Sequence, residues 1–190
     1  MASVPEYRLT PEEYLRMERA AEYKSEYDDG VIIAMSGASL RHNIIVHGLA
    51  RSIGNRLENR CLVLSNDMKV RVLNPTRFFY PDVLVVCDRP QVADDQKDVL
   101  LNPLIVIEVL SESTAKYDRE RKFLSYQEID SLKEYVLVSQ DSPRVEHYRR
   151  EAEHWVYTKS EGLEGTVALP SAGCEIPLRE IYAQIDFTSS

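Results

Sequence analysis

The sequence has little of what marks several common classes of protein. Its three cysteines, Cys61, Cys87 and Cys174, are odd in number, far apart and without the spacing of metal ligands. This pattern argues against a disulfide framework or a zinc site and predicts a protein of the reducing cytoplasm. No apolar run approaches the roughly 18 residues of a membrane span, and residues 1–10 lack the apolar core of a signal peptide. We therefore expect a cytoplasmic protein that does not contact the membrane.

Basic residues are outnumbered by acidic ones. The 190 residues include 23 Lys and Arg against 31 Asp and Glu, so the formal charge is −8. A net negative charge disfavours binding to nucleic acid through diffuse attraction of phosphate, although a local basic groove is compatible with it. The hydrophobic content of 44% is enough to bury a core, which argues against a disordered chain. We expect one domain over residues 1–190.

The pattern of apolar residues predicts a sheet packed against helices. Thr10 and Glu13 form a capping box for a helix over 11–20, and Ser39 is the expected N-cap of a long helix over 40–59. The other predicted elements are a hairpin over 24–36, strands over 62–73, 80–87 and 104–110, a loop over 88–102, a helix over 115–129, a strand over 134–138, a hairpin with strands 145–149 and 155–158, a strand near 175–176 and a helical turn over 178–182. This order is typical of an α/β (α+β) fold with a central mixed β-sheet flanked by helices.

One acid lies where an apolar residue is expected. Glu108 interrupts the strand 104–110, whose β-branched run indicates a central strand covered on both faces. Strand alternation places Glu108 on one face with Val106 and Leu110. A buried carboxylate needs a metal or a base as its partner. The alternative is a position at the strand's end, where Glu108 meets water.

A second acid lies at the head of another apolar strand. Asp82 follows Pro81, and proline is tolerated at the start of a strand. If this strand neighbours the Glu108 strand, the two lie about 5 Å apart and both carboxylates reach one divalent ion. Oxygen ligands favour Mg²⁺ or Mn²⁺, which are ions of phosphate chemistry. The alternative is that Pro81 and Asp82 are ordinary turn residues.

Four segments follow one another in a specific order: EYDDG at 26–30, YPDV at 80–83, IEVLSEST at 107–114, and the helix with Asp118 and Lys122. Together they resemble the Uma-type family of restriction endonucleases, within the PD-(D/E)xK nuclease superfamily. The similarity runs from about residue 9 to residue 187. It implies a restriction-endonuclease-like core, DNA as the partner, and hydrolysis of phosphodiester bonds with Mg²⁺, or alternatively Mn²⁺, as the cofactor.

The resemblance also implies a set of metal ligands. Asp82 matches the metal-binding aspartate of the superfamily, and Glu108 matches the acid of its (D/E)xK element. The carbonyl of Val109 is a further ligand, and Glu26 matches an additional acid near the first hairpin. Judged without the family, Glu26 is a surface acid beside a turn.

The lysine of the superfamily pattern is missing from its usual place. Leu110 stands there, and the resemblance implies that Lys122 on the following helix replaces the lysine. A lysine near the attacking water orients it and stabilises developing negative charge. The alternative for Lys122 is an ordinary helical ion pair with Asp118, four residues earlier.

Several basic residues are candidates for contact with the nucleic-acid backbone. They are Arg41, Lys69, Arg71, Lys116 and Arg119. The last two belong to a basic run that is also typical of a solvated helix face. The histidines His42 and His47 lie five residues apart on the predicted long helix, and we expect a poor metal pair.

We therefore predict a Mg²⁺-dependent endonuclease that acts on DNA, and cleavage of both strands suits a homodimer. An alternative from another class is a catalytically inactive nuclease-fold protein that serves as a binding module or scaffold. Leu110 and the charge of −8 are compatible with this alternative. A third interpretation is a metal-dependent hydrolase of a smaller phosphoester.

Overall fold

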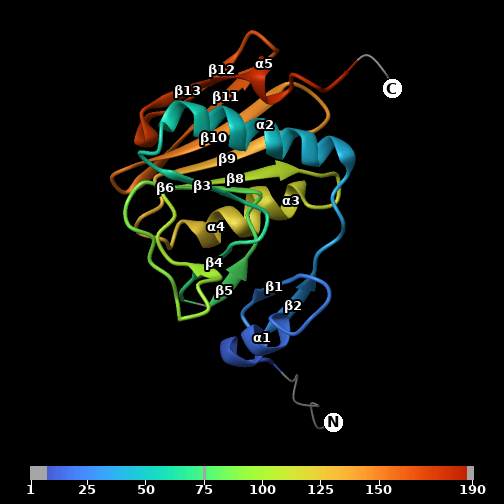
Figure 1. Ribbon diagram of the computed structural model, residues 1–190, viewed down its shortest axis with the longest axis vertical. Helices are drawn as coiled ribbons and strands as arrows, with labels where there is room; N and C mark the ends of the chain where they lie inside the picture. The colour runs from blue at the N-terminus through green and yellow to red at the C-terminus, as the bar shows by residue number, and fades with distance from the viewer. Residues whose placement is uncertain (1–7, 75, 188–190) are drawn as a thin grey trace.

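Two β-sheets and several helices build the fold, which is seen in a computed structural model that describes residues 8–74 and 76–187 (Figure 1). The large sheet contains β3 (Leu62–Ser65), β6 (Val83–Val86), β8 (Ile105–Leu110), β9 (Glu134–Ser139), β10 (Arg144–Glu151) and β11 (His154–Glu161). The small sheet contains β1 (Ser25–Asp28), β2 (Val31–Ala34), β4 (Lys69–Val72), β5 (Arg77–Phe79) and β7 (Val99–Leu100). A separate ribbon pairs β12 (Thr166–Leu169) with β13 (Cys174–Pro177).

The helical elements are interspersed with the strands along the chain. They are α1 (Pro11–Glu18), α2 (Leu40–Leu57), α3 (Ala115–Tyr117), the π-helical turn η1 (Asp118–Lys122), α4 (Phe123–Tyr126), the 3-10 turn η2 (Pro170–Ala172) and α5 (Leu178–Ile181). None of the helices among the described residues is long and apolar enough to span a bilayer.

Both sheets are mixed, because each contains parallel and antiparallel neighbours. The large sheet runs β11-β10-β9-β8-β6-β3, and the small sheet runs β2-β1-β5-β4-β7. In the large sheet β8 and β9 are parallel, whereas the other neighbours are antiparallel. The prediction of a mixed sheet flanked by helices is confirmed.

The structure confirms the predicted caps of α1 and α2 and the turn of the first hairpin. The Thr10 hydroxyl accepts the N–H of Glu13 and the Glu13 carboxylate accepts the N–H of Thr10, which is the predicted capping box of α1. Ser39 caps α2. Asp29 and Gly30 both have positive φ, which the two-residue turn between β1 and β2 requires.

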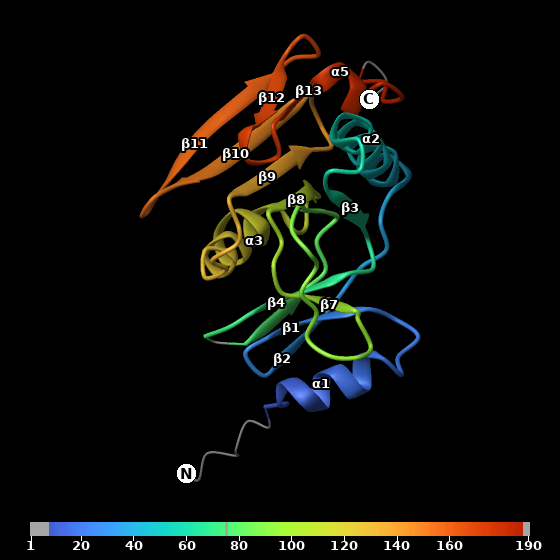
Figure 2. The same ribbon diagram turned by 60° about the vertical axis from the view of Figure 1, so that its left-hand side comes forward.

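The central strand of the large sheet is covered on both faces, as its sequence predicts. All six residues of β8 are buried. One face packs against α2 through Ile45, Leu49 and Ile53. The opposite face packs against the α3–η1–α4 segment and the small sheet, and Figure 2 shows the small sheet lying between this segment and α1. Glu108 alternates onto this second face.

The predicted strand 62–73 is wrong as a single strand, because the chain changes sheet within it and forms first β3 and then β4. The predicted strand 80–87 contains β6, whereas β5, which lies just before it in the small sheet, was not predicted, and the chain changes sheet a second time between β5 and β6. Asn66 takes a positive φ of 67° at the first change of sheet. Pro81 lies at the second, so the residue after it stands where the two sheets meet. The predicted loop 88–102 contains the short strand β7.

The expectation about the cysteines is also wrong. Cys61 and Cys87 form a disulfide, with their Cα atoms 4.0 Å apart. The reason is the register of β3 with β6, in which Leu62 pairs with Val86 and brings the residues just outside the ladder face to face. Spacing along the chain gave no sign of this. Cys174 keeps a free thiol whose pKa is raised by burial.

Candidate active site

Acidic side chains from both sheets meet at the junction where the chain crosses at Pro81. Glu26 comes from β1 of the small sheet and Glu108 from β8 of the large sheet. Asp82 lies between β5 and β6, and Asp118 lies on η1. The fold thus brings together four carboxylates that are distant in sequence.

Asp82 and Glu108 lie on neighbouring strands, as the sequence predicts. Val83 pairs with Ile107 in the antiparallel ladder of β6 and β8, so the preceding and following residues, Asp82 and Glu108, stand opposite each other. At this position the side chain of Asp82, instead of a further backbone carbonyl of β6, accepts a hydrogen bond from β8. Its Oδ2 accepts the N–H of Val109 at 2.7 Å. The acid is therefore fixed against the end of β8.

Lys122 points toward the acids and does more than pair with Asp118. Its Nζ lies 2.9 Å from Glu26 Oε1, 3.2 Å from Glu108 Oε1 and 3.5 Å from Asp118 Oδ1. A π-helical turn bonds residues five apart, so residues four apart face nearly the same side. Because η1 has this geometry, Asp118 and Lys122 both face the site.

Glu26 joins the small sheet to this cluster. Its Oε1 accepts the N–H of Tyr80 at 3.0 Å as well as the Lys122 ammonium. Two residues further along β1, on the same face, Asp28 binds Arg121 at 2.8 Å and Arg77. The hairpin face with both acids therefore lies against η1.

The electrostatics show an excess of negative charge. Burial raises the pKa of Glu108 well above its usual value, and Asp118, Asp82 and Glu26 raise it further against the opposing effect of Lys122. Burial also raises the pKa of Asp118. Burial favours a lower pKa for Lys122, but the surrounding carboxylates outweigh it and hold this pKa well above its usual value. One ammonium is thus shared among several acids.

His42 also reaches the site, a role that was not predicted from the sequence. Its Nε2 lies 3.2 Å from Asp82 Oδ2. His42 is on the first turn of α2, whereas His47 is exposed further along the helix, so the two histidines do not meet. The five-residue spacing between the two histidines carries no information about the contact of His42 with Asp82. The available signal was the place of His42 directly after the Ser39 cap.

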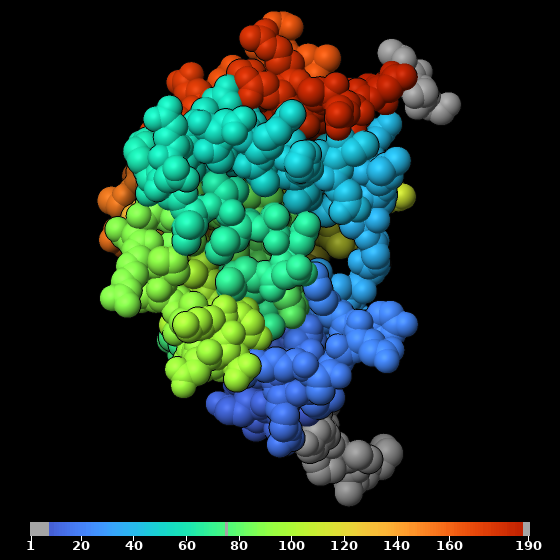
Figure 3. Space-filling view, viewed as in Figure 1, coloured from blue at the N-terminus to red at the C-terminus, as the bar shows by residue number. Residues whose placement is uncertain are grey.

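The site opens toward solvent on the side of Asp82 and His42. Their side chains are 18% and 13% exposed, whereas Lys122 is 8% exposed and Glu108 5%. Figure 3 shows the surface hollowed between the body of the molecule and the segment that links β2 to α2. A ligand entering from solvent meets Asp82 and His42 first.

The donor set fits a hard divalent cation. Across the described residues, no three His, Cys, Asp or Glu side chains are already grouped as a metal site. Mg²⁺ commonly uses one or two protein carboxylates and keeps several waters, so Asp82 and Glu108 suffice as protein ligands. The cluster holds four carboxylates and one lysine, and a cation would offset the remaining negative charge.

Two of the expected nucleic-acid contacts bind acids of the chain itself. Lys69 is buried, with its Nζ 2.9 Å from Asp98 Oδ2 and 3.1 Å from the Tyr80 hydroxyl. Arg119 lies 2.8 Å from Glu146 Oε1. Neither side chain offers an unpaired charge to a phosphate in this arrangement.

The other three candidates keep more of their charge available. Arg41 donates to the carbonyls of Gln140 and Asp186, at 3.2 and 3.0 Å. Arg71 is half-buried on β4, and Lys116 is exposed on α3. These three have no carboxylate partner within the described parts of the chain.

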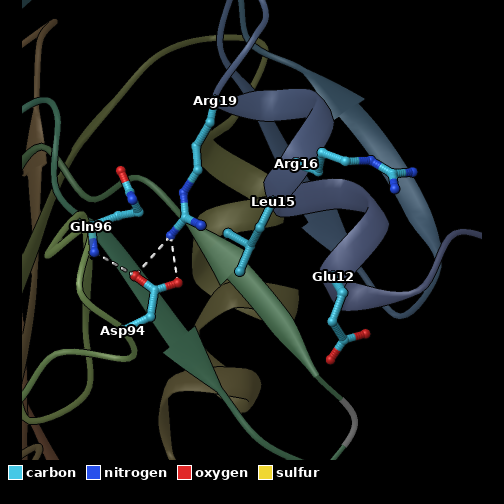
Figure 4. A pocket seen from close by; sticks show the side chains of 6 residues that line it. All are labelled: Glu12, Leu15, Arg16, Arg19, Asp94 and Gln96. Carbon is cyan, nitrogen blue, oxygen red and sulfur yellow. Dashed lines mark hydrogen bonds and ion pairs between the residues drawn. The ribbon is translucent and has the colours of Figure 1, made fainter.

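A hollow of about 380 Å³ lies elsewhere, between α1 and the loop before β7 (Figure 4). Arg19 crosses it to bind Asp94 and Asp98. Its lining shares no residue with the carboxylate cluster and consists of Glu12, Leu15, Arg16, Arg19, Asp94 and Gln96. Since Arg19, which crosses the hollow, is already paired with acids, we assign no chemistry to it.

The sequence is similar to a family model and to two proteins of Synechocystis. Residues 11–179 match the family model Uma2, described as "Putative restriction endonuclease". The uncharacterised Synechocystis proteins sll1609 and slr1290 are similar: sll1609 is 36% identical over 81% of this chain and 88% of its own length. For slr1290 the identity is 35% over 97% of both chains.

A solved structure shares the fold. It is a crystal structure described as "a putative nuclease belonging to DUF820" from Anabaena variabilis, with a TM-score of 0.74. The match covers 92% of this chain and 98% of that one. Since the identity is only 18%, the likeness concerns the fold alone.

Proposed function

Because the chain belongs to the Uma2 family, we propose that it is a metal-dependent endonuclease that hydrolyses DNA phosphodiester bonds. Mg²⁺ is the proposed cofactor, with Mn²⁺ as the alternative. The nuclease-like fold supports this proposal. Cleavage of both strands of a duplex suits a homodimer, which we include in the proposal.

One observation supports the assignment most directly. The Lys122 ammonium lies within 3.5 Å of Glu26, Glu108 and Asp118, beside an aspartate held at the end of the adjacent strand. Burying this many charged groups is costly and adds little to stability by itself. A site for phosphate chemistry accounts for them.

The acids have the role of holding the ion. Asp82 and Glu108 are the proposed metal ligands, with the Val109 carbonyl and Glu26 as further ligands. When bound, the ion supplies Lewis-acid polarisation of the phosphate and lowers the pKa of a bound water. Because Glu26 comes from the small sheet, its participation would make the site depend on both sheets.

Lys122 acts as a hydrogen-bond donor in this proposal. Its raised pKa keeps it protonated at neutral pH, which disfavours a role as general base. The ammonium instead orients the attacking water and stabilises negative charge that develops on the phosphate. Such a donor replaces the lysine that Leu110 does not provide.

The test compares cleavage of supercoiled, linear and single-stranded DNA by the wild-type protein and by Asp82→Asn and Glu108→Gln. We expect each substitution to lower the Mg²⁺-dependent rate at least about a hundredfold, since each removes a charge that holds the ion. Asp88→Asn is the matched control, because Asp88 is exposed just beyond the other end of β6.

Two results would contradict the proposal. Unchanged cleavage in Asp82→Asn or Glu108→Gln would remove these residues from the mechanism. If the folded wild-type protein cleaves no DNA form in Mg²⁺ or Mn²⁺, the catalytically inactive scaffold becomes the better interpretation.

A further inference from the structure

The two oxygens of the Asp82 carboxylate have different surroundings. Oδ2 receives both the N–H of Val109 at 2.7 Å and His42 Nε2 at 3.2 Å. Since a carboxylate only accepts, Nε2 is the protonated nitrogen in this contact. Within residues 8–74 and 76–187, no hydrogen bond or ion pair falls on Oδ1. Donors of the protein therefore bind Oδ2 and leave Oδ1 without a partner among the described residues.

Glu108 shows the same division. Its Oε1 lies 3.2 Å from Lys122 Nζ and accepts the hydroxyl of Tyr126 at 3.1 Å. The part of the chain that the structure describes places no donor on Oε2. Each of the two strand acids thus has one oxygen fixed by the protein and one left for a ligand.

The His42 ring is built into the fold rather than free on its surface. Ser39 Oγ accepts the His42 backbone N–H at 3.0 Å, which fixes the first turn of α2. The Nδ1 atom is buried and has no hydrogen-bond partner among the described residues. A buried, unpaired acceptor costs free energy that an apolar side chain would avoid. This cost makes a purely structural role for the ring a poor explanation.

We propose that His42 is a positioning residue that fixes the Asp82 carboxylate so that Oδ1 faces the metal ion. The inference rests on the proposed function and adds a residue to it. Without the ring, one backbone N–H alone restrains the acid, and rotation about its last side-chain torsion becomes easier. Losing a group that hydrogen-bonds a metal ligand typically weakens metal binding about 10- to 100-fold.

The test measures Mn²⁺ binding by electron paramagnetic resonance, without DNA, for wild type, His42→Leu and His42→Gln. We expect His42→Leu to weaken binding about 10- to 100-fold. Glutamine carries its amide nitrogen at nearly the position of Nε2, so His42→Gln should recover most of the affinity. His47→Leu, on the same helix but exposed, is the matched control and should bind like wild type.

Cleavage assays separate positioning from direct catalysis. For His42→Leu we expect a higher Mg²⁺ concentration at half-maximal rate, with most of the rate recovered when Mg²⁺ saturates. A rate that stays low at saturating Mg²⁺ would overturn the positioning role. Equal Mn²⁺ affinity in wild type and His42→Leu would overturn it as well.

The result also separates this inference from the proposed function. If wild type and Asp82→Ala both fail to bind Mn²⁺, the proposed metal site itself is wrong. If wild type binds Mn²⁺ and Asp82→Ala does not, the metal site is supported. The Mn²⁺ affinities of the His42 variants then decide whether His42 positions Asp82. Should His42→Leu unfold, His42→Asn replaces it: its amide is too short to reach Asp82, so equal affinity in His42→Asn and His42→Gln would reject the inference.

Discussion

Tyr126 is the second donor to the Glu108 oxygen that Lys122 contacts. The ring is fully buried on α4, and its hydroxyl lies 3.1 Å from Oε1. Removing this hydroxyl leaves a buried carboxylate with one donor fewer, which costs about 1–3 kcal/mol. In the proposed mechanism, a less restrained Glu108 also holds the ion less well.

We expect Tyr126→Phe to lower both the free energy of unfolding and the rate of DNA cleavage. Urea denaturation should show a loss of about 1–3 kcal/mol. The cleavage rate at limiting Mg²⁺ should fall about tenfold, the lower end of the effect for groups that orient metal ligands.

Tyr14→Phe is the control for Tyr126. The Tyr14 hydroxyl is also buried and donates to a carbonyl, that of Ser25, at 2.6 Å. We expect a similar loss of stability with no loss of cleavage rate. Equal losses of rate in both variants would show that Tyr126 acts only through stability.

Individual residues of the site differ in how far the sequence reveals them. Glu108 is conspicuous because burial and charge conflict within one strand, and Asp82 because proline fixes where its strand begins. Lys122 is ambiguous, since Asp118 at helical spacing explains it equally well. Its contact with Glu26 depends on how the small sheet packs against η1, which periodicity along the chain does not specify.

At the scale of elements, the ion pair between Arg56 and Glu180 links α2 to α5. Arg56 donates to both carboxylate oxygens of Glu180 at 2.8 Å, and the Ser52 hydroxyl donates at 2.5 Å. The hydrogen bonds from Arg56 and Ser52 lower the pKa of Glu180 to about 2. A carboxyl with a lowered pKa in the folded state stabilises the fold at pH values above its unfolded pKa. This contribution disappears as the pH falls toward the folded value.

We expect Glu180→Gln to lower the free energy of unfolding by about 1 kcal/mol at neutral pH. The effect is this small because the side chains of Arg56 and Glu180 are 29% and 39% exposed, and solvent screens their charges. The difference from wild type should shrink as the pH falls from about 4.5, the ordinary pKa, toward 2. Urea denaturation across this pH range measures it. Glu175→Gln, at an exposed position on β13, should show no comparable difference, and a difference for Glu180→Gln that persists at the lowest pH would contradict the assignment.

Most elements were predictable because their signals are local. Capping residues set the starts of α1 and α2, and an apolar, β-branched run broken only by Glu108 marks β8. The division of 62–73 into β3 and β4 was not predictable in this way, because a chain that passes from one sheet to another keeps its apolar residues, and β5 was missed. Asn66, with its positive φ, marks the first change of sheet. The disulfide between Cys61 and Cys87 follows from strand register, which is a long-range property.

At the scale of the whole molecule, 13 of the 23 Lys and Arg residues form ion pairs with acids of the chain itself. Those that form ion pairs are Arg8, Arg19, Lys24, Arg56, Lys69, Arg77, Arg119, Arg121, Lys122, Arg144, Arg149, Lys159 and Arg179. The other ten form no ion pair within the described structure, and they are set against a formal charge of −8 for the whole chain. The affinity of the protein for DNA should therefore depend weakly on salt.

Of the five basic residues expected to contact DNA, three lack an acid partner in the described structure: Arg41, Arg71 and Lys116. Each neutralised phosphate contributes about −0.9 to the slope of log K against log salt for a duplex, so three contacts give a slope of about −3. Fluorescence anisotropy of a labelled duplex over a series of KCl concentrations measures this slope. Glu108→Gln is the form to use, since we expect it to cleave at least about a hundredfold more slowly than wild type.

Lys116 provides the sharper test of this electrostatic argument. It follows the end of β8 that carries Glu108, whereas Lys133 precedes the parallel strand β9 and lies at the opposite end of the sheet. We expect Lys116→Ala to reduce the slope by about 1, and Lys133→Ala, which is also exposed, to leave it unchanged. A slope much steeper than −3 that neither substitution alters would mean that DNA lies on another surface, away from the carboxylates that we propose hold the metal.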